Sequence, residues 1–212
     1  MKRVLVIAAH PDDEIFGVGG TIIKHIDNGD NVYLLIITDG VSATHMKNGK
    51  ELSLLRKENC KSAGDSLLIN EVIFKDFPDA KLDTIPQLEI NKVLEKEIDR
   101  INPDVIYTHS EKDLHEDHKI VNKATIIATR RKRIDLYCYE IIGSTIGFNP
   151  NFYVDISNEL SYKLKVARVY KDLLNEFPHP ISLEALKILA RYRGIESGLN
   201  AAEAFECIRR FE

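Results

Sequence analysis

Five short apolar runs along the chain predict buried β-strands. Each run is continuous instead of alternating between apolar and polar residues, which is typical of strands that are covered on both faces of a parallel sheet. The predicted strands are Val4–Ala8, Val32–Ile37, Glu71–Phe74, Val105–Tyr107 and Asp135–Tyr139.

The segments between these runs have the pattern of amphipathic helices, because their apolar residues recur every three or four positions. Strands and helices that alternate in this way favour an α/β fold with a Rossmann-like, mostly parallel sheet flanked by helices. The predicted helices are Phe16–Ile26, Leu52–Ser66, Gln87–Ile101 and Lys119–Ala128.

The pattern changes after about Pro150. Ser157 and Ser182 are candidate N-caps for two further helices, which the proline-containing stretch 178–180 separates. No repeat, low-complexity tract or linker interrupts the sequence. We therefore expect residues 1–212 to form a single domain, with a helical C-terminal segment packed on the same sheet.

Composition and charge narrow the class of protein. The 212 residues include 29 Lys and Arg against 33 Asp and Glu, so the net charge is −4 and no basic excess favours nucleic acid as a partner.

The N-terminal apolar run Val4–Ala9 is too short for a signal peptide, and no run is long enough for a membrane span. The cysteines at 60, 138 and 207 are widely spaced, which favours a reducing compartment. We expect a cytoplasmic protein.

A first group of chemically active residues, His10-Pro11-Asp12-Asp13-Glu14, comes directly after the first predicted strand. Ligands of α/β sheets bind beyond the carboxyl ends of the strands, which is where this motif lies. His10 and Asp13 are three residues apart on a turn that enters a helix, so both can face one cation while Asp12 points elsewhere. The alternative is a plain helix start with an aspartate N-cap, but a cap needs one acid and no histidine.

A second group follows the fourth predicted strand and contains three of the seven histidines, at 109, 115 and 118. His115 and His118 are three residues apart, so one helical turn can direct both into a cleft. Taken alone, this segment is equally well a solvated loop that opens a helix. Together the two motifs supply a close pair of ligands and a distant one, which is what an open catalytic zinc site needs. Fe²⁺, Mn²⁺ or Co²⁺ suits the same ligand types.

The glycines at 17, 19 and 20 do not form the G-x-G-x-x-G pattern of a dinucleotide-binding loop. We expect them instead to let the first helix approach the sheet closely. Arg56 lies on the second predicted helix, where an arginine is usually solvated. It would have a functional role only if an acidic or hydroxyl-rich substrate had to be held near the metal.

The motifs AAHPDDE (Ala8–Glu14) and HEDH (His115–His118) together resemble those of the PIG-L/LmbE-like zinc-dependent N-deacetylases. This resemblance implies that His10, Asp13 and His118 bind one zinc ion and that Asp12 is the general base.

The same resemblance implies further roles. His115 would polarise the amide carbonyl or stabilise the tetrahedral intermediate, and Asp117 would orient it. Arg56 would contact the substrate. Relatives of this size often assemble, so we expect a homo-oligomer.

The leading hypothesis is a hydrolase that removes an N-acetyl group from an N-acetylglucosamine-type sugar or its conjugate. Two alternatives stay open: a metal-dependent amidase or esterase that acts on a non-sugar substrate, and a metal- or sugar-binding module without catalysis. The carboxylate of Asp12 argues against the binding module, which needs no spare acid beside the metal. The loops expected to select the substrate are His45–Lys50, Phe77–Leu82 and the segment after Tyr139.

Overall fold

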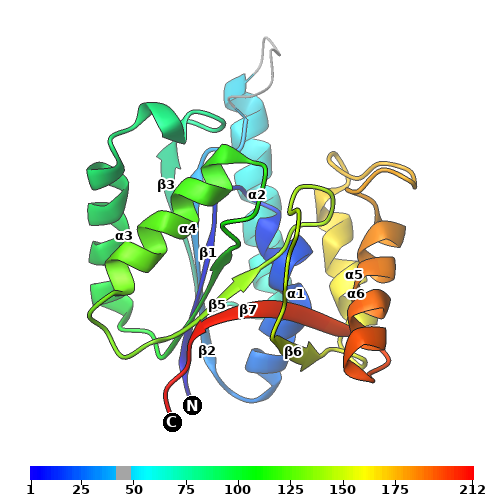
Figure 1. Cartoon of the computed structure of the whole chain (residues 1–212). Helices are drawn as coiled ribbons and strands as arrows, with labels where there is room; N and C mark the ends of the chain where they lie inside the picture. The colour runs from blue at the N-terminus through cyan, green and yellow to red at the C-terminus, as the bar shows by residue number, and fades with distance from the viewer. Residues whose placement is uncertain (42–48) are drawn as a thin grey trace.

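The computed structural model describes residues 1–41 and 49–212, and its elements alternate from β1 to β5 as the apolar pattern predicts (Figure 1). The strands are β1 (Arg3–Ala8), β2 (Asn31–Thr38), β3 (Glu71–Phe77), β4 (Val105–His109), β5 (Asp135–Tyr139), β6 (Phe152–Asp155) and β7 (Ala202–Arg209). The α-helices are α1 (Asp13–Asp27), α2 (Gly49–Leu67), α3 (Gln87–Ile101), α4 (Glu116–Thr129), α5 (Leu160–Ala167) and α6 (Leu183–Ser197), with short 3₁₀ turns at Leu82–Thr84 and Arg168–Tyr170.

The described strands form one sheet in the order β3-β2-β1-β4-β5-β7-β6. β1 to β5 are parallel, and β7 is antiparallel to both of its neighbours, β5 and β6. Helices α3 and α4 lie on one face of the sheet, whereas α1, α2, α5 and α6 lie on the other (Figure 1). This arrangement confirms the predicted α/β fold with a mostly parallel sheet flanked by helices.

The apolar run of β1 is continuous because both faces of this strand are buried. Val4, Val6 and Ala8 pack into the cluster under α1 and α2, and Leu5 and Ile7 pack into the cluster under α3 and α4. Each fully buried side chain of this kind contributes about 1.5–3 kcal/mol of burial free energy. The sheet therefore holds the ends of β1 and β4 in fixed positions.

The C-terminal segment differs in part from the expectation. Ser182 caps α6 as predicted, since its hydroxyl accepts a hydrogen bond from the N–H of Ala185. The prediction that Ser157 caps a helix is wrong: its hydroxyl donates to the Asp155 carboxylate, and α5 begins only at Leu160. The segment is also not purely helical, because it supplies the two antiparallel strands β6 and β7.

Helix α1 has an irregular backbone at Val18, where φ is −136°. Just beyond it, the N–H groups of Gly20 and Thr21 donate to the carboxylate of Glu203 on β7. The ammonium of Lys163 on α5 neutralises this carboxylate at 2.6 Å. A Cβ atom at Gly17 would clash with the ring of Tyr139, which confirms that this part of α1 needs glycine for its close approach to the sheet.

Among the described residues, no helix has both the length and the apolar character needed to span a membrane.

Candidate metal centre and active site

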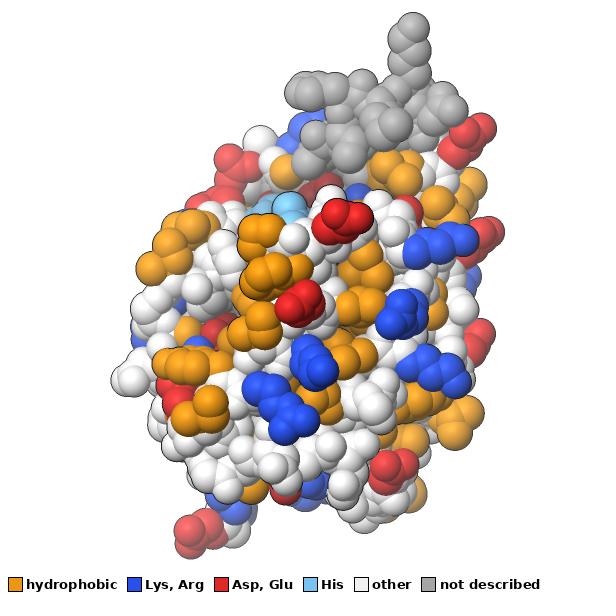
Figure 2. Space-filling model, turned by 90° about the vertical axis from the view of Figure 1, so that its right-hand side faces the viewer, with side chains coloured by type: hydrophobic (Ala, Val, Ile, Leu, Met, Phe, Trp, Pro, Cys, Tyr) orange, Lys and Arg blue, Asp and Glu red, His pale blue; other side chains and the backbone are white. Residues whose placement is uncertain are grey.

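The two sequence motifs meet at the carboxyl edge of the sheet. His10-Pro11-Asp12 connects β1 to α1, and His115 opens α4 after β4; since β1 and β4 are neighbours, the two turns lie side by side. They line a cavity of about 340 Å³. In the view of Figure 2, histidine side chains reach the surface beside hydrophobic and acidic ones. The cavity also has an apolar wall, made of Phe16, Ile141, Ile142, Leu173 and Ile181.

Three donor atoms converge in this cavity. His10 Nδ1 lies 3.3 Å from Asp13 Oδ2 and 3.1 Å from His118 Nε2, and His118 Nε2 lies 3.5 Å from Asp13 Oδ2. All three side chains are buried. Burial opposes ionisation of the Asp13 carboxyl, but the facing ring of His118 and the contact with His10 outweigh it and hold its pKa well below the usual range. Asp13 is therefore a carboxylate.

The far side of the His10 ring contacts two further carboxylates. Nε2 lies 3.0 Å from Asp79 Oδ1 and 3.2 Å from Asp117 Oδ2. Asp117 itself is fixed by the backbone N–H groups of Ala80 and Leu82, at 2.7 and 3.1 Å. Burial would lower the pKa of His10, but the surrounding carboxylates raise it well above its ordinary value. The same negative charge would stabilise a bound divalent cation.

The His118 ring is in close contact with Asp113, although Nδ1 of His118 lacks hydrogen-bond geometry toward any described residue. Nδ1 of His118 lies 3.1 Å from Asp113 Oδ2, and the hydroxyls of Ser144 and Thr145 donate to that same oxygen. Burial of Asp113 is outweighed by its contact with His118, and the pKa of this aspartate falls to about 2. Contacts of this type fix the orientation of a metal-binding imidazole.

His109, at the end of β4, belongs to the same cluster but differs in role. Its Nε2 accepts a hydrogen bond from the N–H of Ala9 at 2.9 Å and lies 3.3 Å from Asp13 Oδ2. Burial, helped by the neighbouring His118, lowers its pKa to about 4, so the ring is neutral. Because the lone pair of Nε2 is directed at a backbone N–H, this nitrogen is poorly suited to bind a metal. The ring instead packs beneath His118 with centroids 3.9 Å apart.

Asp12 lines the cavity beside the converging atoms. Its φ of 136° lies in a region that residues other than glycine rarely adopt. The aspartate side chain forms no cap on α1, so the alternative of a plain helix start does not hold for Asp12. Burial, together with the adjacent charge of Asp13, raises the pKa of the Asp12 carboxyl well above its ordinary value.

His115 and Arg56 also line this cavity. Nδ1 of His115 accepts a hydrogen bond from the N–H of Asp117 at 3.2 Å, which leaves the proton of the neutral ring on Nε2. Burial lowers the pKa of His115 and keeps the ring neutral. The backbone of Asp117, and not its carboxylate, therefore forms the hydrogen bond with His115, whereas the carboxylate of Asp117 contacts His10. The buried Arg56 Nε has no hydrogen-bond partner among the described residues.

Sequence reasoning assigned no role to three residues of this site: Asp79, His109 and Asp113. Asp113 lies two residues before His115, and His109 ends the preceding strand. Both residues therefore belong to the second group of histidines and acidic residues that the sequence analysis identified. Asp79 comes from the expected loop Phe77–Leu82. Of the loop His45–Lys50, residues 45–48 lie outside the described part of the chain.

The described residues contain three overlapping groups whose donor atoms lie close enough to hold an ion. They are His10, His115 and His118; His10, Asp79, His115 and Asp117; and Asp13, His109 and His118.

Comparison with known proteins gives consistent results. The family description "PIG-L: GlcNAc-PI de-N-acetylase" matches residues 5–129. A diacetylchitobiose deacetylase from Thermococcus kodakarensis is 30% identical over 230 residues, which cover 98% of this chain and 84% of the relative. A probable N-acetyl-alpha-D-glucosaminyl L-malate deacetylase 2 from Bacillus subtilis is 30% identical over 138 residues, or 62% of each chain.

A solved structure with the same fold is the N,N'-diacetylchitobiose deacetylase from Pyrococcus horikoshii. It has a TM-score of 0.83 and 25% sequence identity, and the match covers 98% of this chain and 84% of that chain. Histidine and aspartate donors gathered at the carboxyl edge of a parallel sheet are the arrangement that a metal-dependent enzyme needs. The family match spans more than half of the chain, and the Thermococcus relative spans nearly all of it. The chain belongs to the PIG-L family of de-N-acetylases, which confirms the predicted family and the predicted class of enzyme.

Proposed function

We propose that this chain removes the acetyl group from the nitrogen of an N-acetylglucosamine unit within a small conjugate or oligosaccharide. Two relatives carry names of that kind, diacetylchitobiose deacetylase and N-acetyl-glucosaminyl L-malate deacetylase. The cavity of about 340 Å³ is at the small end of ligand pockets, which suits one sugar unit inside and the rest of the conjugate outside. Its apolar wall can receive the acetyl methyl group.

The observation that carries this proposal is the convergence of His10, Asp13 and His118. For a tetrahedral zinc ion with bonds of about 2.0–2.1 Å, ligand atoms lie roughly 3.3–3.4 Å apart. The three donor atoms are 3.1, 3.3 and 3.5 Å from one another, so they suit one zinc ion without rearrangement. Fe²⁺, Mn²⁺ or Co²⁺ accepts the same donors. A bound ion of this kind lowers the pKa of water and polarises a carbonyl.

The chain's own residues supply the remaining steps of amide hydrolysis. Asp12 takes a proton from the attacking water and later delivers one to the leaving amine. The Nε2–H of neutral His115 donates to the carbonyl oxygen as negative charge develops on it. Asp117 orients His10 through the 3.2 Å contact, and Asp113 orients His118. The guanidinium of Arg56, which lines the cavity, holds a sugar hydroxyl or the conjugate's acidic group.

The test is acetate release from N,N'-diacetylchitobiose and from other N-acetylglucosamine conjugates, measured with zinc-loaded enzyme, with chelator, and after zinc is restored. Acetate that disappears with chelator and returns with zinc supports the proposal. The panel includes simple N-acetyl amides and acetate esters without a sugar. Acetate from these alone would contradict the sugar substrate, and a zinc-loaded enzyme that releases none from any compound would contradict deacetylation.

We also propose that the enzyme acts in the cytoplasm as a homo-oligomer. All three cysteines are free thiols, and two of them are buried, which suits a reducing compartment. Light scattering of the purified protein tests the oligomer, and a single-chain mass would contradict it.

A further inference from the structure

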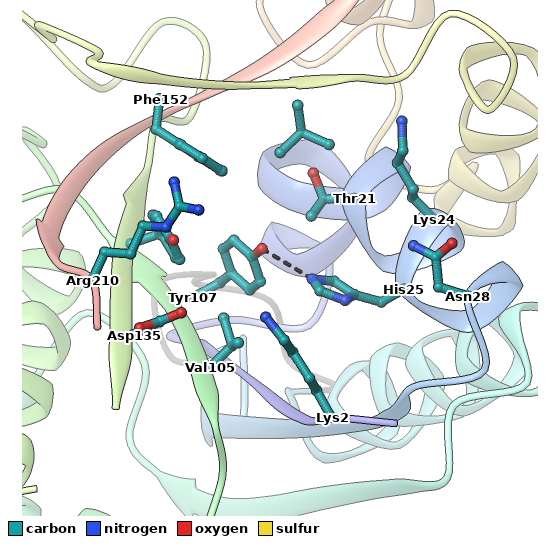
Figure 3. A pocket seen from close by; sticks show the side chains of 12 residues that line it. Lys2, Thr21, Lys24, His25, Asn28, Val105, Tyr107, Asp135, Phe152 and Arg210 are labelled. Atoms are coloured by element: carbon teal, nitrogen blue, oxygen red, sulfur yellow. Dashed lines mark hydrogen bonds between the residues drawn. The ribbon is translucent and has the colours of Figure 1, made fainter. Parts of the chain in front are cut away.

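A second cavity, of about 200 Å³, opens at the opposite edge of the sheet (Figure 3). The amino ends of β1, β4 and β5 meet there, and the C-terminal turn of α1 closes one side. Lys2 precedes β1, Val105 begins β4, and Lys24 and His25 lie on α1. We call this cavity the amino-edge pocket. None of its lining residues belongs to the candidate active site.

The electrostatic character of the amino-edge pocket is positive. Three cations line it, Lys2, Lys24 and Arg210, against one carboxylate, Asp135. Asp135 already accepts a hydrogen bond from the N–H of residue 211 at 2.8 Å. Among the salt bridges of the described residues, none involves Lys2, Lys24 or Arg210. The Lys24 ammonium donates one hydrogen bond, to the backbone oxygen of Asp155 at 2.6 Å, and two of its protons are left for a ligand. Figure 3 shows the Arg210 guanidinium directed toward the open space between Phe152 and Tyr107, and the Lys2 ammonium beside Val105.

One wall of the pocket is a stack of aromatic rings. Tyr107 and Tyr137 lie nearly parallel with centroids 5.5 Å apart, and Tyr137 continues the stack onto Phe152 at 4.7 Å. The Arg210 guanidinium lies 6.0 Å from the centre of the Phe152 ring. Such a wall offers flat apolar surface to a ligand that carries its own ring.

A buried polar group in the wall has no hydrogen-bond partner in the described part of the chain. Thr21 is 1% exposed, and its hydroxyl oxygen forms no hydrogen bond with any described residue. A buried hydroxyl without a partner costs about 1–3 kcal/mol, so such groups are rare unless something outside the chain binds them. In Figure 3 the Thr21 hydroxyl faces the same space as Phe152 and Lys24.

We propose that the amino-edge pocket binds a small organic anion, a carboxylate or phosphate joined to an aromatic or other flat apolar group. The cations Lys24 and Arg210 bind the anionic group, the Tyr107–Tyr137–Phe152 stack contacts the flat group, and the Thr21 hydroxyl provides one hydrogen bond. A volume of about 200 Å³ equals that of roughly seven water molecules, which limits the ligand to a single ring with its acidic substituent. This proposal is independent of the substrate of the active site.

The experiment is calorimetric titration of the zinc-loaded protein with phenyl phosphate, compared with phenol and with inorganic phosphate. We expect saturable binding at one site per chain, with phenol and inorganic phosphate bound about tenfold or more weakly. Lys24→Gln and Arg210→Gln should each weaken phenyl phosphate by about tenfold or more, and Thr21→Val by less. The matched control is Lys123→Gln, which removes one exposed charge on α4 and should leave the affinity unchanged.

Three outcomes would overturn the proposal. The first is the absence of saturable binding, and the second is equal affinity for inorganic phosphate. The third is an affinity for phenyl phosphate that Lys24→Gln and Arg210→Gln leave unchanged, since binding would then occur elsewhere, for example at the metal. Circular dichroism of each variant confirms that it is folded, so a loss of affinity reports on the pocket.

Discussion

At the scale of single residues, Asp12 combines a functional position with a strained backbone. Its φ of 136° costs a non-glycine residue on the order of 1–3 kcal/mol, and such strain persists where the surrounding structure holds it. Here both ends are held: β1 fixes the residues before Asp12, and α1 begins directly after it. The two neighbouring elements therefore hold the Asp12 carboxylate in the cavity, away from the position in which it would cap α1.

Replacing Asp12 with Asn keeps the shape of the side chain and removes its capacity to accept a proton. We expect turnover to fall by about 10²–10⁴-fold while one metal ion per chain remains bound. Acetate release and elemental analysis measure the two effects. The control Asp65→Asn changes an exposed aspartate of α2 and should alter neither. Loss of the metal together with activity would show that Asp12 is a ligand.

Asp113 offers a second test, because it acts only through His118. The Asp113→Asn variant keeps the contacts with Ser144 and Thr145 but weakens the hold on His118 Nδ1. We expect the affinity for zinc to fall about 10–100-fold, measured by competition with a chromogenic chelator. Glu116→Gln, on an exposed residue three positions away, is the control. An unchanged zinc affinity in Asp113→Asn would contradict the positioning role.

Much of the candidate site was predictable at this scale, because His10 and Asp13, and likewise His115 and His118, are close in sequence. The contact between Asp79 and His10 was not. Asp79 follows β3, which is two strands away from β1 in the sheet, and an apolar pattern does not give strand order. Likewise, the carboxylate of Asp117 contacts His10, which belongs to the other motif. The spacing of residues within one motif does not predict a contact between the two motifs.

At the scale of elements, α1 depends on a buried ion pair. The Glu203 carboxylate accepts hydrogen bonds from two N–H groups beyond the irregular backbone at Val18, and Lys163 neutralises it. Both charged side chains are buried. The pair thus joins α1, α5 and β7 at one point.

Replacing Lys163 with Met leaves the Glu203 carboxylate buried without its counter-charge. We expect the free energy of unfolding to fall by about 3–5 kcal/mol, measured by urea denaturation. Lys165→Met, on the exposed face of the same helix α5, is the matched control and should change it by less than about 0.5 kcal/mol. Equal losses in the two variants would mean that the buried pair has no special role.

The elements that sequence reasoning missed, β6 and β7, lack the pattern that identified the others. β6 has four residues, all half-buried, at the edge of the sheet. β7 carries two glutamates among its eight residues, and one of them, Glu203, is buried with Lys163 and two backbone N–H groups as partners. A pattern of apolar positions predicts strands buried by hydrophobic contacts, and it does not detect a strand that is held by an ion pair.

At the scale of the whole molecule, the metal should stabilise the fold, because its ligands come from two separate βα turns. An ion present at about 1,000 times its dissociation constant adds roughly 4 kcal/mol to the free energy of unfolding. For a domain of this size, that corresponds to a rise in Tm of about 10 °C. Scanning calorimetry with chelator, and then with zinc restored, measures the change.

The control for this measurement is His118→Ala, whose Tm should respond weakly to chelator. Mg²⁺ should restore little of the lost stability, because histidine nitrogen is a poor ligand for it. A Tm that chelator leaves unchanged in the native chain would contradict a metal shared by the two turns.

The place of β7 in the sheet also has a consequence for how the chain folds during synthesis. β7 lies between β5 and β6, although it follows all the other described strands in the sequence. Until residues 202–209 leave the ribosome, β5 has an open edge and β6 has no strand to pair with. Parallel strands β1 to β5 can assemble first, but the exposed edge of β5 is open to pairing with other chains. The nascent protein is therefore exposed to aggregation until β7 emerges, and a chaperone would help most before that stage.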